Sequence, residues 1–169
     1  MKNSILSIFI FVITIISSLQ LTAQEFKSLD KSPMDVAVFP SSYKISEKIV
    51  KVIYSRPQLK GRDLVKLAPP EKIWRTGANE ATEITFYKDV VFGGKELKAG
   101  TYSLFTIPSL DKDWTVIINS ARNVWGSYYY NQNLDVIRVS GKTSKVDENI
   151  CFKFIVFITP NNFIIIHIT

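Results

Sequence analysis

Short runs of β-branched and aromatic residues recur along most of the chain, and they predict strands. Each run is four to eight residues long and is bounded by glycine, proline, asparagine or aspartate, which commonly end strands. No long segment shows the 3.6-residue spacing of apolar side chains that an amphipathic helix requires. The predicted strands cover residues 49–54, 84–91, 102–107, 114–118, 136–139 and 152–158.

Two glycine-containing turns separate these strands. The sequence FGGK at 92–95 predicts a tight β-hairpin, because paired glycines adopt positive φ angles at little cost. The sequence KAGT at 98–101 marks the entry to the next strand. Consecutive strands without intervening helices favour an antiparallel arrangement, so we expect an all-β domain built as a β-sandwich or a barrel-like sheet.

The last twenty residues are mostly apolar. The sequence PNN at 160–162 divides them into two arms, each too short to cross a bilayer, so a terminal β-hairpin is the better prediction. The second arm, residues 163–168, alternates poorly between apolar and polar positions. It would form an aggregation-prone edge unless another part of the chain covers it.

The N-terminus has the pattern of a secretory signal peptide. Lys2 precedes a twelve-residue apolar run at 5–16, and small residues lead to a predicted cleavage site after Ala23. That run is shorter than the roughly 20 residues of a membrane span. We therefore expect residues 1–23 to be removed, 24–43 to form an extension and 44–169 to form a single β domain. The expected location is periplasmic or secreted, with no membrane span after cleavage.

The residue inventory limits the chemistry. His167 is the sole histidine and Cys151 the sole cysteine, so sites that need several such ligands are excluded and no disulfide forms within the chain. A nucleophile–histidine system would have to use His167 on a terminal apolar strand, where a plain strand residue is the simpler interpretation. No loop has the acidic spacing of an EF-hand. The sequence therefore predicts no metal and no cofactor, and it leans away from an enzyme.

Positive charge is concentrated in one connecting segment. The whole chain carries a formal charge of +6, and residues 56–75 contain six basic side chains against two acidic ones. Arginine presents a planar set of donors that matches carboxylate, sulfate or phosphate groups. The simpler alternative is a solvated loop whose arginines bond to its own carbonyls. The segment predicts an anionic ligand, with nucleic acid not expected.

The sequence WRTGANEAT at 74–82 adjoins this basic segment and predicts a corner that leads into a strand. Gly77 is expected to permit the turn, and Arg75 and Glu80 either pair across it or face a cleft together. Trp74 is a candidate for stacking on a sugar face. The predicted ligand-binding residues are Arg56, Lys60, Arg62, Trp74, Arg75, Thr76, Asn79 and Glu80.

Six short blocks of the sequence together resemble those of a known family. They stand in a consistent order at 54–57, 60–62, 74–82, 99–108, 114–117 and 125–126. Over roughly residues 32–154 the chain resembles the domain of unknown function 2911, a family of mainly exported proteins. The resemblance implies an exported, mostly β domain without an established activity. The chain departs from the family pattern at 67–73 and after residue 154, where the usual final strands are not recognisable.

Three functions remain open at this stage. The first is a binding module for a glycan, an anionic group or another cell-envelope component. The second is a structural or protein-interaction domain without a small-molecule site. The third is a hydrolase in which Glu80 works with Asp89 or Asp135, which would require two carboxyl groups about 5–9.5 Å apart in one cleft.

Overall fold

The computed structural model describes residues 28–142 and the strand backbones at 154–158 and 164–168. The chain divides into two compact units, Met1–Asp30 and Lys31–Thr169, and the fold is that of the second. The predicted signal peptide lies outside the described residues. Within the described part, the structure contains no helix that has both the length and the apolar character to span a bilayer.

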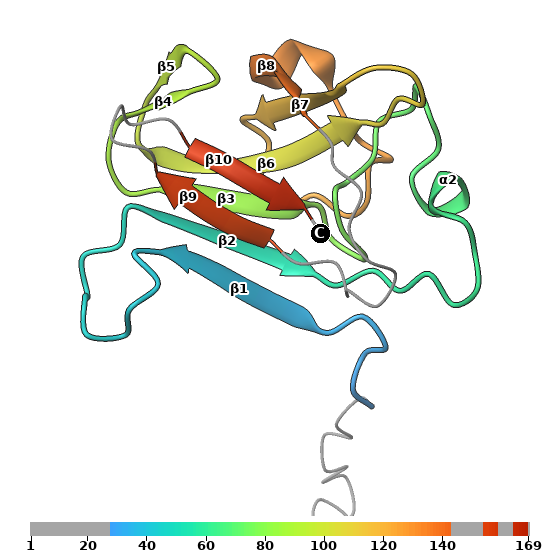
Figure 1. Cartoon of the computed structure of the whole chain (residues 1–169), viewed down its shortest axis with the longest axis horizontal. Coiled ribbons are helices and arrows are strands. Elements are labelled where there is room, and N and C mark those ends of the chain that lie inside the picture. The colour runs from blue at the N-terminus through green and yellow to red at the C-terminus, as the bar shows by residue number, and fades with distance from the viewer. Residues whose placement is uncertain (1–27, 143–153, 159–163, 169) are drawn as a thin grey trace, which may run out of the picture. The chain divides into compact units, whose positions relative to one another are not determined.

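One antiparallel sheet organises the domain (Figure 1). Every neighbouring pair in it is antiparallel, so the prediction of an all-β fold is confirmed. In spatial order its strands are β1 (Met34–Phe39), β2 (Val50–Ser55), β3 (Thr82–Phe86), β6 (Gly100–Ile107), β7 (Trp114–Asn119) and β8 (Asp135–Gly141).

Strand β1 was not among the strands that the sequence pattern predicts. It lies in the segment assigned to an N-terminal extension, yet all six of its residues pair with β2. Its outer residues Met34 and Val36 are more than half exposed. Because β1 is the first strand of the sheet order, its side chains face water more than those of central strands, and the alternation that identifies a strand is weak there.

The predicted glycine turn joins β4 (Val90–Phe92) to β5 (Lys95–Leu97). Gly93 and Gly94 have φ angles of +57° and +80°, so the predicted hairpin is confirmed. The predicted strand at 84–91 is split in two, because the chain turns at 87–89 after leaving β3. Asp89 anchors the hairpin by accepting hydrogen bonds from Lys98 and from the backbone N–H of Ala99.

The predicted terminal hairpin is also confirmed. Strand β9 (Phe154–Ile158) pairs antiparallel with β10 (Ile164–Ile168) in a separate two-stranded sheet, and β9 lies beside β1. The PNN sequence predicted to break the two arms lies outside the described residues. A short helix α2 (Leu64–Leu67) and a 3-10 turn η1 (Gln132–Leu134) complete the described elements.

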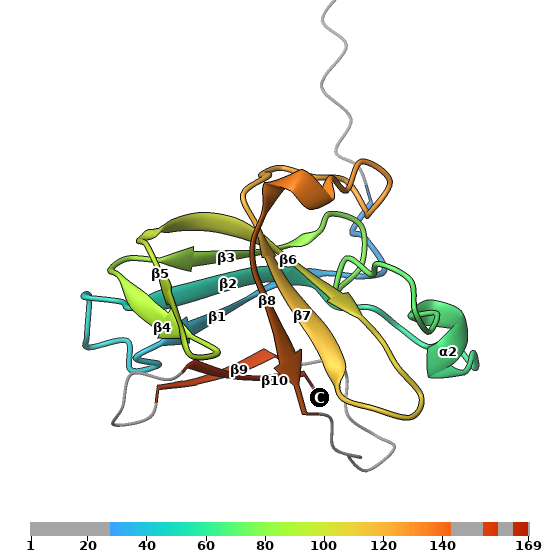
Figure 2. The ribbon, with the colours of Figure 1, turned by 90° about the horizontal axis from the view of Figure 1, so that it is seen from above.

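The two faces of the six-stranded sheet carry different cores. One face packs against the β4–β5 hairpin around Phe86, Leu104 and Ile118, each almost fully buried. The opposite face carries a smaller cluster of Ala81, Phe105 and Ile117, against which parts of segments 73–81 and 120–134 pack. Figure 2 shows the β4–β5 hairpin and the orange segment on opposite sides of the sheet. The second face therefore positions the candidate site.

Candidate functional site

The corner at 74–82 immediately precedes β3 and ends at its first residue, Thr82. Trp74 forms an isolated bridge with Thr106, in which each backbone N–H donates to the other carbonyl at 2.7 and 2.9 Å. Thr82 then pairs with Leu104, two residues away on the same strand β6. A hydrogen bond from the Thr82 N–H to the Arg75 carbonyl, 3.1 Å long, closes the loop between them. The predicted corner into the sheet is thus observed.

The turn geometry differs from the expectation for Gly77. The left-handed conformations belong to Thr76 and Asn79, with φ angles of 56° and 58°, and Gly77 has no positive φ. Gly77 is instead required by close packing, since a Cβ there would lie 3.0 Å from Thr82 Oγ1 and 3.2 Å from the Ser55 carbonyl oxygen. The loop approaches β2 so closely because the Ala78 N–H donates to that carbonyl.

Two of the predicted ligand residues are buried in this structure. Trp74 is 3% exposed and its ring packs edge-on against Trp114, with centroids 6.2 Å apart, so it cannot stack on a sugar in this structure. Thr76 is fully buried, and its hydroxyl contacts the Trp74 carbonyl and Thr106 Oγ1. Both side chains belong to the interior because the bridge to β6 draws this part of the chain onto the sheet.

The polar residues of the corner do not form the predicted cross-turn pair. Arg75 is partly buried and Glu80 is exposed, and the ion pairs of the described residues include none between them. Arg75 Nε is buried without a hydrogen-bond partner among the described residues. Asn79 is partly buried and its carbonyl accepts from the Gly126 N–H. The corner is therefore linked through its backbone to a second segment.

The predicted basic residues are divided between two places. Arg56 follows Ser55, next to the corner, and its Nε lies 3.4 Å from Asp35 Oδ2. Arg62 donates to the carbonyls of Gln58 and Leu59, as the simpler interpretation of the loop predicts. Lys60 is exposed beside it. The structure brings Arg56 towards the corner, while Lys60 and Arg62 lie in the exposed connection around α2.

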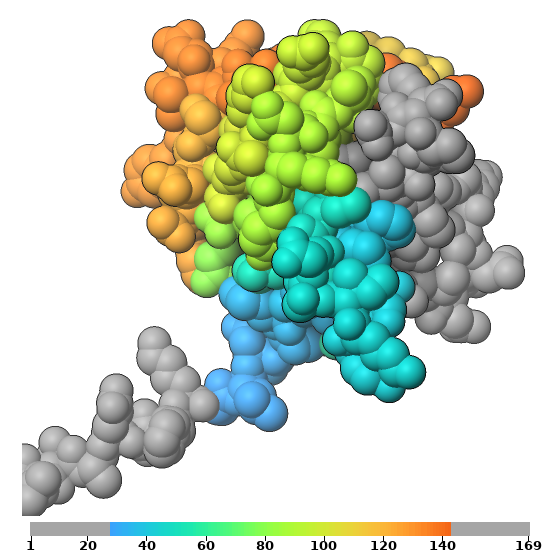
Figure 3. Space-filling view, turned by 90° about the vertical axis from the view of Figure 1, so that its left-hand side faces the viewer, coloured from blue at the N-terminus to red at the C-terminus, as the bar shows by residue number. Residues whose placement is uncertain are grey.

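A second segment, residues 122–131, carries exposed aromatic residues and is called the aromatic loop below. Trp125, Tyr128 and Tyr129 are 55%, 79% and 82% exposed. In the space-filling view of Figure 3 the orange part of the chain, which includes this loop, forms a continuous region of the surface. Sequence reasoning treated Trp125 only as part of the family resemblance, although the composition WGSYYYNQN at 125–133 is itself a signal of a binding loop.

Backbone hydrogen bonds fix the aromatic loop against the corner. The Ala81 N–H donates to the Val124 carbonyl at 2.8 Å, and Glu80 forms an isolated bridge with Trp125. The Asn123 N–H donates to Glu83 Oε1, also at 2.8 Å. The turn at 74–82 therefore has a clear structural role, which is to hold the aromatic loop in place.

A polar cluster fixes the other end of the loop. Tyr130 donates its hydroxyl to Asp135 Oδ2 at 2.6 Å, and Arg138 Nε donates to the same oxygen at 2.6 Å. Asn119 Nδ2 donates to the other carboxylate oxygen at 2.7 Å. The Tyr130 ring packs edge-on against Phe105, which ties the cluster to the second core. Asp135 is thus fully engaged in holding this loop.

This cluster makes stability depend on pH in the alkaline range. Burial, followed by the hydrogen bond to Asp135, raises the pKa of Tyr130 from 10.0 to about 12. The stabilisation of the folded state by the protonated Tyr130 hydroxyl is fully present below about pH 10. It is lost as pH rises through about 12, because the phenol of the unfolded chain releases its proton at a lower pH than that of the folded chain. We expect Tyr130→Phe to flatten the decline in urea midpoint between about pH 9 and about pH 11. Equal declines in both proteins would contradict this assignment.

The structure does not favour either of the carboxylate pairs proposed for hydrolysis. Glu80 precedes β3 and Asp89 follows it, so the length of the strand, about 13 Å, separates them. This exceeds the roughly 5–9.5 Å separation of glycosidase carboxylates. The alternative partner Asp135 is held by Arg138 in the polar cluster. Among the described residues there is also no group of three histidine, cysteine or acidic side chains placed to hold a metal.

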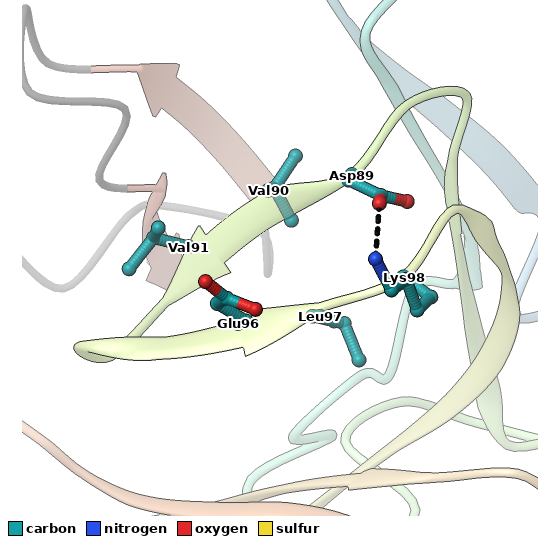
Figure 4. A pocket seen from close by; sticks show the side chains of 6 residues that line it. All are labelled: Asp89, Val90, Val91, Glu96, Leu97 and Lys98. Atoms are coloured by element: carbon teal, nitrogen blue, oxygen red, sulfur yellow. Dashed lines mark hydrogen bonds and ion pairs between the residues drawn. The ribbon is translucent and has the colours of Figure 1, made fainter.

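A depression of about 250 Å³ lies elsewhere, on the β4–β5 hairpin (Figure 4). Lys98 Nζ and Asp89 Oδ2 are 2.7 Å apart at its rim, and both side chains are well exposed. The hydrogen bond from Lys98, with a second from the Ala99 N–H, lowers the pKa of Asp89. These contacts hold the base of the hairpin together, so they explain the depression without a ligand. The lining residues are Asp89, Val90, Val91, Glu96, Leu97 and Lys98.

The fold and the site together define an antiparallel all-β protein that presents a supported loop with exposed aromatic side chains. The chain belongs to the family described as protein of unknown function (DUF2911), whose sequence pattern matches residues 34–162. This match confirms the resemblance found in the sequence. It begins at the first residue of β1, so the family domain includes that strand. No curated protein and no solved structure matches the chain.

Proposed function

We propose that the protein is an exported binding module that holds a glycan on its aromatic loop. The observation that carries the proposal is the exposure of Trp125, Tyr128 and Tyr129 within one short segment whose backbone is hydrogen-bonded at both ends. Tyrosine and tryptophan are enriched at interfaces, and grouped exposed rings mark interaction surfaces. Export is supported by the pattern of residues 1–23.

The chemistry of the loop favours a ligand with apolar faces and hydroxyl groups. Tryptophan and tyrosine provide flat contact area with few rotatable bonds, while serine, asparagine and glutamine provide adaptable hydrogen bonds. Arg122 is the one charged residue between positions 120 and 134. Recognition here would therefore depend on stacking and neutral hydrogen bonds. A sugar ring offers both a C–H face for stacking and a rim of hydroxyls.

The rigidity of the loop supports the same function. The bonds from Ala81 to Val124 and from Gly126 to Asn79 fix its first half, and the Asp135 cluster fixes Tyr130. A loop that is already ordered loses little conformational freedom when a ligand binds, so more of the contact energy appears as affinity. The corner acts as the support in this proposal, whereas the sequence pattern alone places the ligand on the corner itself.

Single aromatic substitutions test the proposal. We expect Trp125→Ala and Tyr129→Ala each to weaken binding of soluble oligosaccharides at least tenfold, because exposed rings of this kind carry most of the energy in such contacts. Binding would be measured by titration calorimetry, after a screen of neutral and uronic-acid oligosaccharides selects the probe. The unfolding midpoint should change little, since both side chains are more than half exposed.

Tyr43→Ala is the matched control. Tyr43 is 89% exposed, comparable with Tyr129, but it lies between β1 and β2 and outside the aromatic loop. The control should retain full affinity. A screen in which no oligosaccharide binds would refute glycan recognition, and equal losses in the Tyr43 and Tyr129 variants would refute the assignment to this loop.

A further inference from the structure

We propose a second interaction surface, in which residues 58–67 dock the protein onto the surface of an anionic phospholipid membrane. This segment is called the docking loop below. Leu59, Leu64 and Val65 are 47%, 48% and 44% exposed within it. Single exposed apolar side chains are common, but three of them grouped within one short loop mark a candidate interaction surface.

Cations lie between these apolar side chains. Lys60, Arg62 and Lys66 are exposed, and Asp63 is the one acidic residue of the segment. Alternation of apolar and basic side chains matches the membrane interface, where acyl chains begin just beneath a layer of anionic headgroups. A nucleic acid would use the cations but leave the leucines in water, so it fits this surface less well.

The shape of the loop presents these side chains outward. A turn closes at its tip, where the Arg62 N–H donates to the Leu59 carbonyl at 2.9 Å and Gly61 has a φ of +74°. The Arg62 side chain also bonds to the carbonyls of Leu59 and Gln58, which stiffens the turn. Helix α2 buries none of its residues. Figures 1 and 2 both show α2 projecting to the side, away from the strands of the sheet.

The docking loop is separate from the aromatic loop, so this inference goes beyond the proposed function and does not depend on it. In Figure 2 the two segments occupy different places, with α2 beside the sheet and the orange segment above it. Substitutions in one surface should therefore leave the activity of the other intact. This separation allows the two proposals to succeed or fail independently.

Vesicle co-sedimentation of the full chain tests the membrane surface. We expect binding to vesicles of phosphatidylglycerol and phosphatidylethanolamine, little binding to phosphatidylcholine alone, and weaker binding as salt is raised. The double variant Lys60→Gln/Lys66→Gln should bind about 25-fold more weakly, at about fivefold for each cation removed. Its charge-matched control is Lys44→Gln/Lys88→Gln, which alters exposed lysines outside the loop and should bind like the parent.

The apolar contribution has its own matched pair. Leu64→Ser should weaken vesicle binding severalfold, whereas Leu110→Ser should not, although Leu110 is 72% exposed. All four variants change exposed residues, so unchanged thermal unfolding would confirm that they remain folded. Vesicle binding that is equal in the parent and both docking-loop variants would overturn the proposal, as would equal binding to phosphatidylcholine. The former result would assign membrane binding to another segment, such as the apolar N-terminus.

Discussion

Replacing Trp74 by alanine is expected to lower the free energy of unfolding by about 3–5 kcal/mol, the range for removing a large aromatic side chain from a packed core. Trp74 is 3% exposed and packs edge-on against Trp114. Its loss would leave a cavity at the point where the corner joins β6. Urea unfolding followed by circular dichroism measures the change. An m-value equal to that of the parent would show that the variant exposes the same amount of surface on unfolding.

Trp125→Ala provides the comparison, because it removes the same side chain from the other end of the same hydrogen-bonded unit. Trp125 is 55% exposed, so its loss should cost less than about 1 kcal/mol. The structure thus predicts opposite effects for two tryptophans, with stability lost in one variant and glycan binding lost in the other. Comparable destabilisation by both substitutions would contradict the burial of Trp74.

Gly93→Ala is the second substitution with a large expected effect, about 2–5 kcal/mol of destabilisation. Gly93 has a φ of +57°, which costs an L residue roughly 1–2 kcal/mol. In addition, a Cβ there would lie 2.5 Å from Val139 Cγ1, and relieving such a clash costs roughly 1–3 kcal/mol. The hairpin tip would have to move away from β8.

Gly94→Ala separates these two costs. Gly94 also has a positive φ, +80°, but no atom lies within 4 Å of the position of its Cβ. It should therefore show the backbone cost alone. The double variant Gly93→Ala/Val139→Ala should recover part of the stability that Gly93→Ala loses, once the cost of Val139→Ala alone is subtracted. If Gly93→Ala and Gly94→Ala were equally destabilising, the contact between the hairpin and β8 would be absent in solution.

The sequence predicted those features that depend on local chemistry. The paired glycines at 93–94 specified the hairpin, because few other residues adopt positive φ at two successive positions. The predicted ends of β6 and β7 lie within two residues of the observed ends. The dense β-branched and aromatic composition of these strands reflects burial on both faces of the sheet, which makes them easy to recognise in the sequence. The terminal hairpin was predicted from its two apolar arms for a similar reason.

Features that depend on tertiary contacts were missed. Nothing in the local sequence distinguishes Trp74, which is buried, from Trp125, which is exposed, because the burial of Trp74 depends on its contacts with the distant residues Thr106 and Trp114. Gly77 was expected to supply a positive φ, but its role depends on Ser55, a residue of another strand. The candidate site therefore moved from the corner to the loop that the corner supports.

The order of strands in the main sheet bears on how the chain assembles. From β1 to β8 each strand lies beside the previous one in the sequence, except that the β4–β5 hairpin is set aside between β3 and β6. A polypeptide that emerges with its N-terminal end first would therefore find the partner of each new strand already in place. The largest loop to close is residues 56–81 between β2 and β3, which contains the docking loop and the corner, so the pairing of β3 is expected to carry the greatest entropic cost.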